Sequence, residues 1–276
     1  MTVKPIQFGT GRQLTNLAYV QTLADFFSHY SQVPHIQIKI KTAQAVISQI
    51  NAGFLPPKID DLTITENDIE LLQQHVLQQF PTDMAAGNQY WQELIEPLEM
   101  LDETLSELRD VLMTTFDMYH YPNEVFMHQL DAYIGQASVL EIMAGQGYLS
   151  AGLRALNPAR ELVATDDQSW EKQPGDHIMP VTDVLNMDAL DALNKYGQAS
   201  DVILMSWAPD TDDIDMQVLN WVRVNAPKAK LLVIGEKHGA TNSREFWQEA
   251  QLTDLTELND ALTSFDLIDE KIYLAR

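Results

Sequence analysis

Two glycines and an acidic pair have the residue types and the spacing needed to bind a nucleotide. Gly145 and Gly147 lie two residues apart, and Asp166-Asp167 begins 19 residues after the second glycine. A glycine turn lets the backbone approach a ligand closely, where a Cβ would obstruct it. A carboxylate about 20 residues further on can accept hydrogen bonds from both hydroxyl groups of a ribose. The spacing therefore predicts a nucleotide-binding crevice.

The flanking segments supply the elements that such a crevice needs. Residues 138–142 form a short apolar run, which is typical of a strand buried on both faces of a parallel sheet. Residues 148–156 carry leucines at helical spacing and stop at Asn157-Pro158, and residues 162–165 predict a second strand that ends at Asp166. This order indicates an α/β fold of the Rossmann-like, doubly wound kind with a mostly parallel sheet.

The run after the first strand resembles the first motif of the class I S-adenosylmethionine-dependent methyltransferases, an acid followed by spaced glycines. The motif here is Glu141-Ile142-Met143-Ala144-Gly145-Gln146-Gly147, with Met143 at the first glycine position. Three later motifs of the family correspond to Asp166, with Asp167 as an alternative, to Asp183-Val184, and to the strand and loop DVILMSWAP of residues 201–209. The resemblance covers roughly residues 125–276.

The resemblance implies S-adenosyl-L-methionine as the cofactor and methyl transfer to a small molecule or a protein side chain. The residues that it assigns to cofactor binding are Glu141, Ala144, Gly145, Gly147, Asp166, Asp167, Asp183, Val184, Ser206 and Trp207. It names no catalytic residue, because the family shares cofactor residues rather than one base. The candidates for contact with the acceptor are Tyr119, His120, Tyr121, His128, Trp207 and Pro209, and the candidate bases after the fourth and fifth strands are Asp210, Glu236 and His238.

The first half of the chain is expected to be helical. Residues 1–124 are predicted to form an all-α N-terminal domain that serves as a cap or in dimerisation, and residues 125–276 to form the cofactor-binding domain. Helices are predicted over about residues 13–30, 65–80 and 89–119. The last of these has leucines at heptad spacing, which pack within the helical bundle or at a homodimer seam, and Pro97 predicts a kink or a restart.

Two segments leave alternatives open. Residues 35–41 alternate as a strand does, but the helix-like residues that follow also allow one helix across both. After a fifth strand at residues 231–235, only about ten strand-like residues remain for the sixth and antiparallel seventh strands of the family. The sheet edge is therefore expected to be shortened, or to be completed by the N-terminal region.

Composition limits the classes of function. The net charge of −23 disfavours nucleic acid as a partner, because phosphate backbones are bound mainly by Lys and Arg. The chain has no cysteine, no apolar run long enough for a membrane span, and no secretory signal, so we expect a cytoplasmic protein. Its histidines lack metal-ligand spacing, and no metal is expected.

Two other functions are compatible with the same motifs. A protein that binds the cofactor without catalysis, as a sensor or structural partner, would keep the glycine turn and the acids. A nicotinamide-dependent oxidoreductase also has a glycine turn followed by an acid, although its GxGxxG pattern would place Gly or Ala where Ser150 stands.

Overall fold

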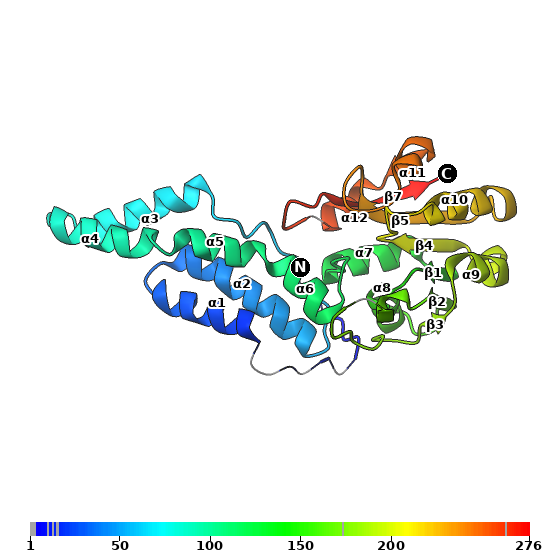
Figure 1. The fold of residues 1–276 in the computed structure, drawn as a ribbon, viewed down its shortest axis with the longest axis horizontal. Coiled ribbons are helices and arrows are strands. Elements are labelled where there is room, and N and C mark those ends of the chain that lie inside the picture. The colour runs from blue at the N-terminus through cyan, green and yellow to red at the C-terminus, as the bar shows by residue number, and fades with distance from the viewer. Residues whose placement is uncertain (1–3, 10, 13, 15–16, 173, 263) are drawn as a thin grey trace.

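The molecule has an elongated helical bundle at one end and a helix-covered sheet at the other (Figure 1). The computed structural model describes residues 4–9, 11–12, 14, 17–172, 174–262 and 264–276. The helices of the bundle are α1 (Ala18–His29), α2 (Pro34–Asn51), α3 (Glu66–Gln79), α4 (Met84–Ile95), α5 (Leu98–Ser106) and α6 (Leu108–Phe116). The first predicted helix thus begins at Ala18, and its expected start at Gln13 lies outside the described residues.

Residues 35–41 belong to helix α2, which settles the choice between strand and helix. Pro34 is at the first helical position, where its missing N–H is not needed. Ile36, Ile40 and Ile47 are buried, whereas Ile38 is exposed. The apolar side chains therefore follow the helical period and cover one face.

The predicted helix over residues 89–119 is three helices, α4 to α6. Pro97 is the N-cap of α5, so the helix restarts there as expected. A second break, at Glu107, was not predicted. The six leucines of the heptad seam are all buried within the chain, namely Leu94, Leu98, Leu101, Leu105, Leu108 and Leu112.

The second half of the chain builds a seven-stranded sheet of order β3-β2-β1-β4-β5-β7-β6. Its strands are β1 (Val139–Ile142), β2 (Leu162–Asp166), β3 (Leu185–Asn186), β4 (Val202–Ser206), β5 (Lys230–Glu236), β6 (Leu252–Asp254) and β7 (Glu270–Ala275). Within the described residues, β7 runs antiparallel to both of its neighbours, β5 and β6, and the other strand pairs are parallel. The strand order reverses between β1 and β4, and open α/β sheets bind ligands at such a point.

Helices cover both faces of this sheet. They are α7 (Glu124–Ile134), α8 (Tyr148–Leu156), α9 (Ala189–Tyr196), α10 (Ile214–Asn225), α11 (Arg244–Glu249) and α12 (Thr256–Leu262). Successive residues of β4 alternate between two cores: Leu204 belongs to the core that includes Leu149 of α8, and Ile203 to the core that includes Leu219 of α10. The fold is therefore the expected doubly wound α/β fold, preceded by a helical region.

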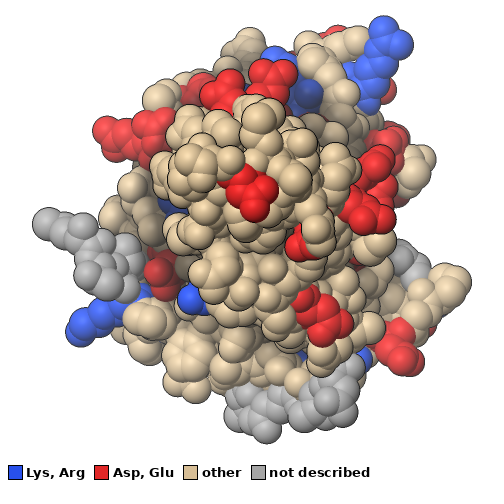
Figure 2. Space-filling view, turned by 90° about the vertical axis from the view of Figure 1, so that its left-hand side faces the viewer, with Lys and Arg blue, Asp and Glu red and all other residues tan. Residues whose placement is uncertain are grey.

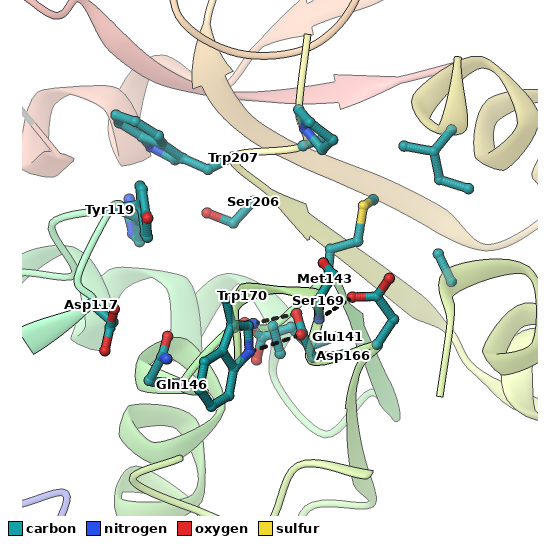
Figure 3. A pocket seen from close by; sticks show the side chains of 18 of the residues that line it. Asp117, Tyr119, Glu141, Met143, Gln146, Asp166, Ser169, Trp170, Ser206 and Trp207 are labelled. Carbon is teal, nitrogen blue, oxygen red and sulfur yellow. Dashed lines mark hydrogen bonds between the residues drawn. The ribbon is translucent and has the colours of Figure 1, made fainter. Parts of the chain in front are cut away.

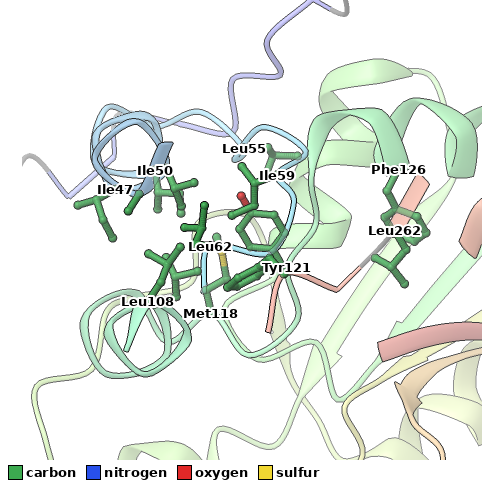
Figure 4. Close-up of a cluster of buried hydrophobic side chains, with 14 of the residues drawn as sticks. Ile47, Ile50, Leu55, Ile59, Leu62, Leu108, Met118, Tyr121, Phe126 and Leu262 are labelled. Atoms are coloured by element: carbon green, nitrogen blue, oxygen red, sulfur yellow. The ribbon is translucent and has the colours of Figure 1, made fainter. Parts of the chain in front are cut away.

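One of these cores extends without a break into the helical bundle. Figure 4 shows side chains of the bundle, such as Ile47 and Leu108, beside Leu55, Leu62 and Tyr121 of the connecting segments. The same cluster includes residues of α7, α8 and α12. The bundle is thus held against one face of the sheet by continuous apolar packing.

The far edge of the sheet differs from both expectations. It is complete, because β7 pairs with β5 on one side and with the three-residue strand β6 on the other. The N-terminal region does not add a strand to it within the described residues, where its β pairing is an isolated bridge between Gln7 and Phe54. A three-residue strand has too few residues to show an alternating pattern, which is why β6 was missed.

The acidic composition is visible on the outside of the bundle. Figure 2 shows the end formed by α3 and α4, where acidic side chains are scattered between wide areas of uncharged residues and basic side chains are fewer. No helix in the described ranges is both long enough and apolar enough for a membrane span.

Candidate functional site

A cavity of about 740 Å³ lies at the carboxyl edge of the sheet, where the strand order reverses. Its walls include Met143 and Gly145 after β1, Asp166 at the end of β2, and Ser206 and Trp207 at the end of β4 (Figure 3). Cavities of roughly 300–1,000 Å³ accommodate small ligands and cofactors. The predicted glycine turn, ribose acid and fourth-strand loop are therefore brought together at one cavity.

The turn between β1 and α8 depends on its two glycines for different reasons. Gly145 has φ +53°, and a Cβ there would have no described atom within 4 Å, so its missing side chain leaves space at the cavity. Gly147 has φ +78°, and a Cβ there would lie 2.8 Å from Cγ2 of Val184. Left-handed backbone is strained for residues with a Cβ. Met143, at the first glycine position of the motif, nevertheless has φ +53°.

Asp166 joins the glycine turn to the loop after β2. One of its oxygens accepts from the Gly145 amide at 2.8 Å. The other accepts from the Gln168 amide at 2.8 Å and from Nε1 of Trp170 at 3.1 Å. Burial raises the pKa of Asp166, and these hydrogen bonds lower it in part. Asp167 also lines the cavity and is exposed.

Glu141, the acid of the first motif, is buried at the base of the cavity. Burial raises its pKa from 4.5 to about 7, while hydrogen bonds from Ser150 and the charge of Arg154 act in the opposite direction. The Ser150 hydroxyl donates to the Glu141 carboxyl group, which ties α8 to β1. Ala144 anchors the turn on the other side, because its amide donates to the Thr165 carbonyl at 3.0 Å.

The wall formed by β4 carries polar and aromatic groups. Trp207 has a left-handed backbone with φ +53°, and its ring centroid lies 6.1 Å from that of Tyr119. The Ser206 hydroxyl and Nε2 of Gln146 are buried and have no hydrogen-bond partner in the described part of the chain. Buried polar groups are rarely left unpaired in native proteins. These two atoms are therefore available to a ligand.

The expected position of Asp183 and Val184 after the third strand is wrong. Strand β3 is Leu185–Asn186, so both residues precede it, and neither is among the described residues that line the cavity. Val184 instead packs over Gly147. The cavity residues that follow β3 are Asp188 and Ala189. Asp188 was missed, although its role as N-cap of α9, accepting from the Asp191 amide, left a capping signal in the sequence.

The candidates for acceptor contact separate into two groups. Tyr119, His120 and Pro209 line the cavity, along with Trp207. Tyr121 donates its hydroxyl to the Pro57 carbonyl, and His128 lies 3.4 Å from the Lys4 carbonyl. The other candidates that are not among the described lining residues are Asp210, Glu236 and His238. Asp117 and Trp170 also line the cavity, and neither was predicted from the sequence as a site residue.

The cavity is strongly acidic. Its carboxylate residues are Asp117, Glu141, Asp166, Asp167, Asp188, Asp212 and Asp213. Neither Lys nor Arg is found among the described residues that line it. Such a wall favours a cationic or neutral ligand over an anionic one. The described residues contain no cluster of His, Asp and Glu suited to a metal ion.

The strand order and the antiparallel β7 agree with the fold that the sequence motifs implied. This is the sheet that the resemblance to the class I methyltransferases implied. In this fold the glycine turn, the acid after β2 and the loop after β4 share one edge of the sheet, which is the arrangement found here.

Comparisons with known proteins identify solved structures only. No protein-family model matches the chain, and no curated protein matches it. The plantazolicin methyltransferase BpumL in complex with SAH is 12% identical, with 62% of this chain and 61% of that chain covered and a TM-score of 0.31. This chain thus spans about three fifths of the length of BpumL.

Two further solved structures cover more of the chain. MtNAS in complex with S-adenosylmethionine is 8% identical, with 76% of this chain and 89% of that chain covered and a TM-score of 0.35. The N,N-8-amino-8-demethyl-D-riboflavin dimethyltransferase RosA from Streptomyces davawensis is 12% identical, with 77% and 70% covered and a TM-score of 0.33.

Proposed function

We propose that this protein is an S-adenosylmethionine-dependent methyltransferase acting on a small molecule or a protein side chain. The observation that carries the proposal is the meeting of the Gly145 turn and the Asp166 carboxylate at the cavity beside β1 and β4. The cofactor supplies an electrophilic methyl group on a positively charged sulfur. The protein then has to hold both reactants in line, which contributes up to about 7–11 kcal/mol to catalysis.

The residues present fit this cofactor. The open space beside Gly145 would admit the methionine portion, and the Ser206 hydroxyl, which has no partner among the described residues, offers a polar contact. Asp166 would accept from the ribose hydroxyls, with Asp167 beside it. We assign the adenine side of the cavity to Asp188 and Ala189 in place of Asp183 and Val184, because the former follow β3 and line the cavity.

The hydrogen bonds of the Asp166 carboxylate have to change when the ribose of the cofactor binds. A carboxylate accepts about four hydrogen bonds, and three are already made within the protein. A ribose with two hydroxyl groups therefore competes with the indole N–H of Trp170 for one oxygen. We infer that Trp170 moves from Asp166 when the ribose enters, or that Asp167 takes the second hydroxyl.

The charge of the cavity favours a sulfonium cofactor over a nicotinamide dinucleotide. The pyrophosphate of a dinucleotide is doubly anionic and is usually bound by a glycine turn at a helix N-terminus. Here Asp166 accepts from the Gly145 amide of that turn, and other acidic residues of the cavity lie nearby. A sulfonium and an ammonium group, by contrast, are attracted by such surroundings.

The proposal is tested by measuring cofactor binding first and methyl transfer second. Calorimetry with S-adenosylmethionine, its demethylated product and NAD⁺ decides between the cofactors, and thermal stabilisation by the same ligands provides an independent measure. Transfer of labelled methyl groups to a panel of small molecules and to protein extracts then tests for activity. Stabilisation by NAD⁺ alone would reject the proposal. Binding of the sulfonium without transfer to any acceptor would favour a sensor or structural role.

A further inference from the structure

A buried histidine and a buried glutamate form a pair beside the cavity. Nδ1 of His120 lies 2.8 Å from Oε1 of Glu270, although the two residues are 150 positions apart in the sequence. His120 comes from the segment between α6 and α7, and Glu270 is the first residue of β7. Their exposed fractions are 8% and 4%. The pair is thus held by the fold and is largely shielded from water.

The surroundings determine which atom of the pair carries the proton. Burial alone would raise the pKa of Glu270, but the contact with His120 and the charge of Arg109 lower it overall. The carboxylate is therefore ionised and accepts the hydrogen bond, so Nδ1 of His120 is the protonated ring nitrogen. In the neutral imidazole, Nε2 then holds a lone pair.

Nε2 of His120 is the free end of this pair. It is buried and has no hydrogen-bond partner among the residues that the structure describes, and His120 lines the cavity. A carboxylate that orients one imidazole nitrogen while the other faces a reactant is the arrangement of a general base.

Glu270 also positions the aromatic wall. The carboxylate oxygen that contacts His120 accepts from Nε1 of Trp207 as well. Arg109 lies over the Trp207 ring at 5.4 Å and donates to the Tyr119 carbonyl at 2.7 Å. One buried network thus holds His120 and the two rings, Tyr119 and Trp207, that border the same part of the cavity.

We infer that His120 is the general base of the acceptor site, and that the acceptor is an uncharged molecule bearing an acidic hydroxyl group, such as a phenol. This inference rests on the methyl transfer proposed above. The hydroxyl proton passes to Nε2 of His120, and an oxygen electron pair forms the new bond to the methyl carbon. The carbon–sulfur bond breaks, its electrons neutralise the sulfonium, and His120 later releases the proton to water.

A neutral phenol is compatible with the chemistry of the cavity. A phenol with an ordinary pKa of about 10 is neutral at pH 7, and the carboxylates around it oppose its spontaneous ionisation. It therefore needs a base, and a phenol gives up its proton to an imidazole far more readily than an aliphatic alcohol does. An anionic acceptor would be repelled by Asp117, which lies on the same side of the cavity as Tyr119 (Figure 3).

The decisive variant is His120→Gln, with His128→Gln as the matched control because His128 is not among the described lining residues. We expect binding of the demethylated cofactor to stay within about twofold in both variants. Methyl transfer to the best acceptor in a panel of phenols, alcohols and amines should fall about 10²–10⁴-fold in His120→Gln only. An unchanged rate, or transfer to amines in preference to phenols, would overturn the inference.

A second measurement needs no cofactor. Bound 4-nitrophenol reports its ionisation by its absorbance, and we expect it to ionise at lower pH in the wild type than in His120→Gln. Failure to bind, or equal titrations, would count against the base. If the wild type binds no sulfonium cofactor but shows this difference, the proposed function fails and the base remains.

Glu270→Gln tests the positioning residue. It keeps an oxygen acceptor for His120 but removes the charge that stabilises a protonated imidazole. The acid limb of the pH–rate profile should then move to lower pH, together with a loss of rate, because the imidazolium loses its counter-ion. A loss of rate at every pH without movement of the profile would indicate a purely structural role for Glu270 and would reject the pair as a catalytic unit.

Discussion

Glu141 provides a test of the site that does not depend on any ligand. Its pKa is raised from 4.5 to about 7 because the carboxyl group is fully buried. In the unfolded chain the group ionises near its ordinary value. Between these two values the folded protein binds more protons than the unfolded one, so stability falls as pH rises through this window. A shift of this size corresponds to roughly 3 kcal/mol.

Glu141→Gln removes this dependence. Glutamine keeps a carbonyl oxygen to accept from the Ser150 hydroxyl, and it stays neutral at every pH. We therefore expect the variant to resemble the wild type near pH 4.5 and to be more stable by roughly 3 kcal/mol at pH 8. For a chain of this length that difference is about 5–10 °C in Tm.

The assay is thermal and urea unfolding of both proteins at several values between pH 4.5 and 8. Glu161→Gln serves as the control, since Glu161 is exposed and the variant also removes one negative charge. The reasoning is refuted if the stabilities of wild type and Glu141→Gln run parallel across the range. It is also refuted if Glu161→Gln gains as much stability as Glu141→Gln at pH 8.

Substitutions at three other positions test the ribose contact, the glycine turn and the cap of a bundle helix. Asp166→Asn should weaken binding of the demethylated cofactor by about 10- to 150-fold in calorimetry, because a charge-assisted hydrogen bond contributes about 1.5–3 kcal/mol. The same weakening in Asp167→Asn, with none in Asp166→Asn, would assign the ribose contact to Asp167. Gly147→Ala should lower the free energy of unfolding, measured in urea, by more than the roughly 1–2 kcal/mol that a left-handed backbone costs a residue with a Cβ. The additional loss is expected because this Cβ would lie 2.8 Å from a methyl group. A loss no larger than that strain would contradict the clash. Thr65→Ala should cost about 1 kcal/mol by removing the cap of α3, whereas Thr65→Ser should keep it.

Local signals predicted the part of the fold that surrounds the glycine turn. The apolar run, the glycines and the Asn157-Pro158 stop predicted helix α8 over Tyr148–Leu156, as observed. They also predicted β1 and β2 to within one residue. Each of these elements carries its own boundary residues, so neighbouring positions in the sequence contain the information.

Other parts of the site depend on contacts that no local pattern contains. Strand β3 has two exposed residues and hence no apolar run, which is why Asp183 was placed after it and Asp188 was overlooked. His120 was identified only as one of several aromatic and histidine candidates, because its partner Glu270 is far away in the chain. The return of the Trp170 indole to Asp166 has no signal in residue type or spacing.

The shared apolar core limits how this chain can be divided. Gly152 of α8 leaves room for Leu55, since a Cβ there would lie 2.8 Å from the leucine Cδ1. The Asn123 side chain donates to the carbonyl of Ala261, and the Tyr148 hydroxyl of α8 donates to the carbonyl of Phe116. Cutting the polypeptide after residue 124 would strip both fragments of these partners. We expect neither fragment to be soluble alone and the intact chain to melt in a single calorimetric transition, so any minimal version of this protein has to retain the bundle.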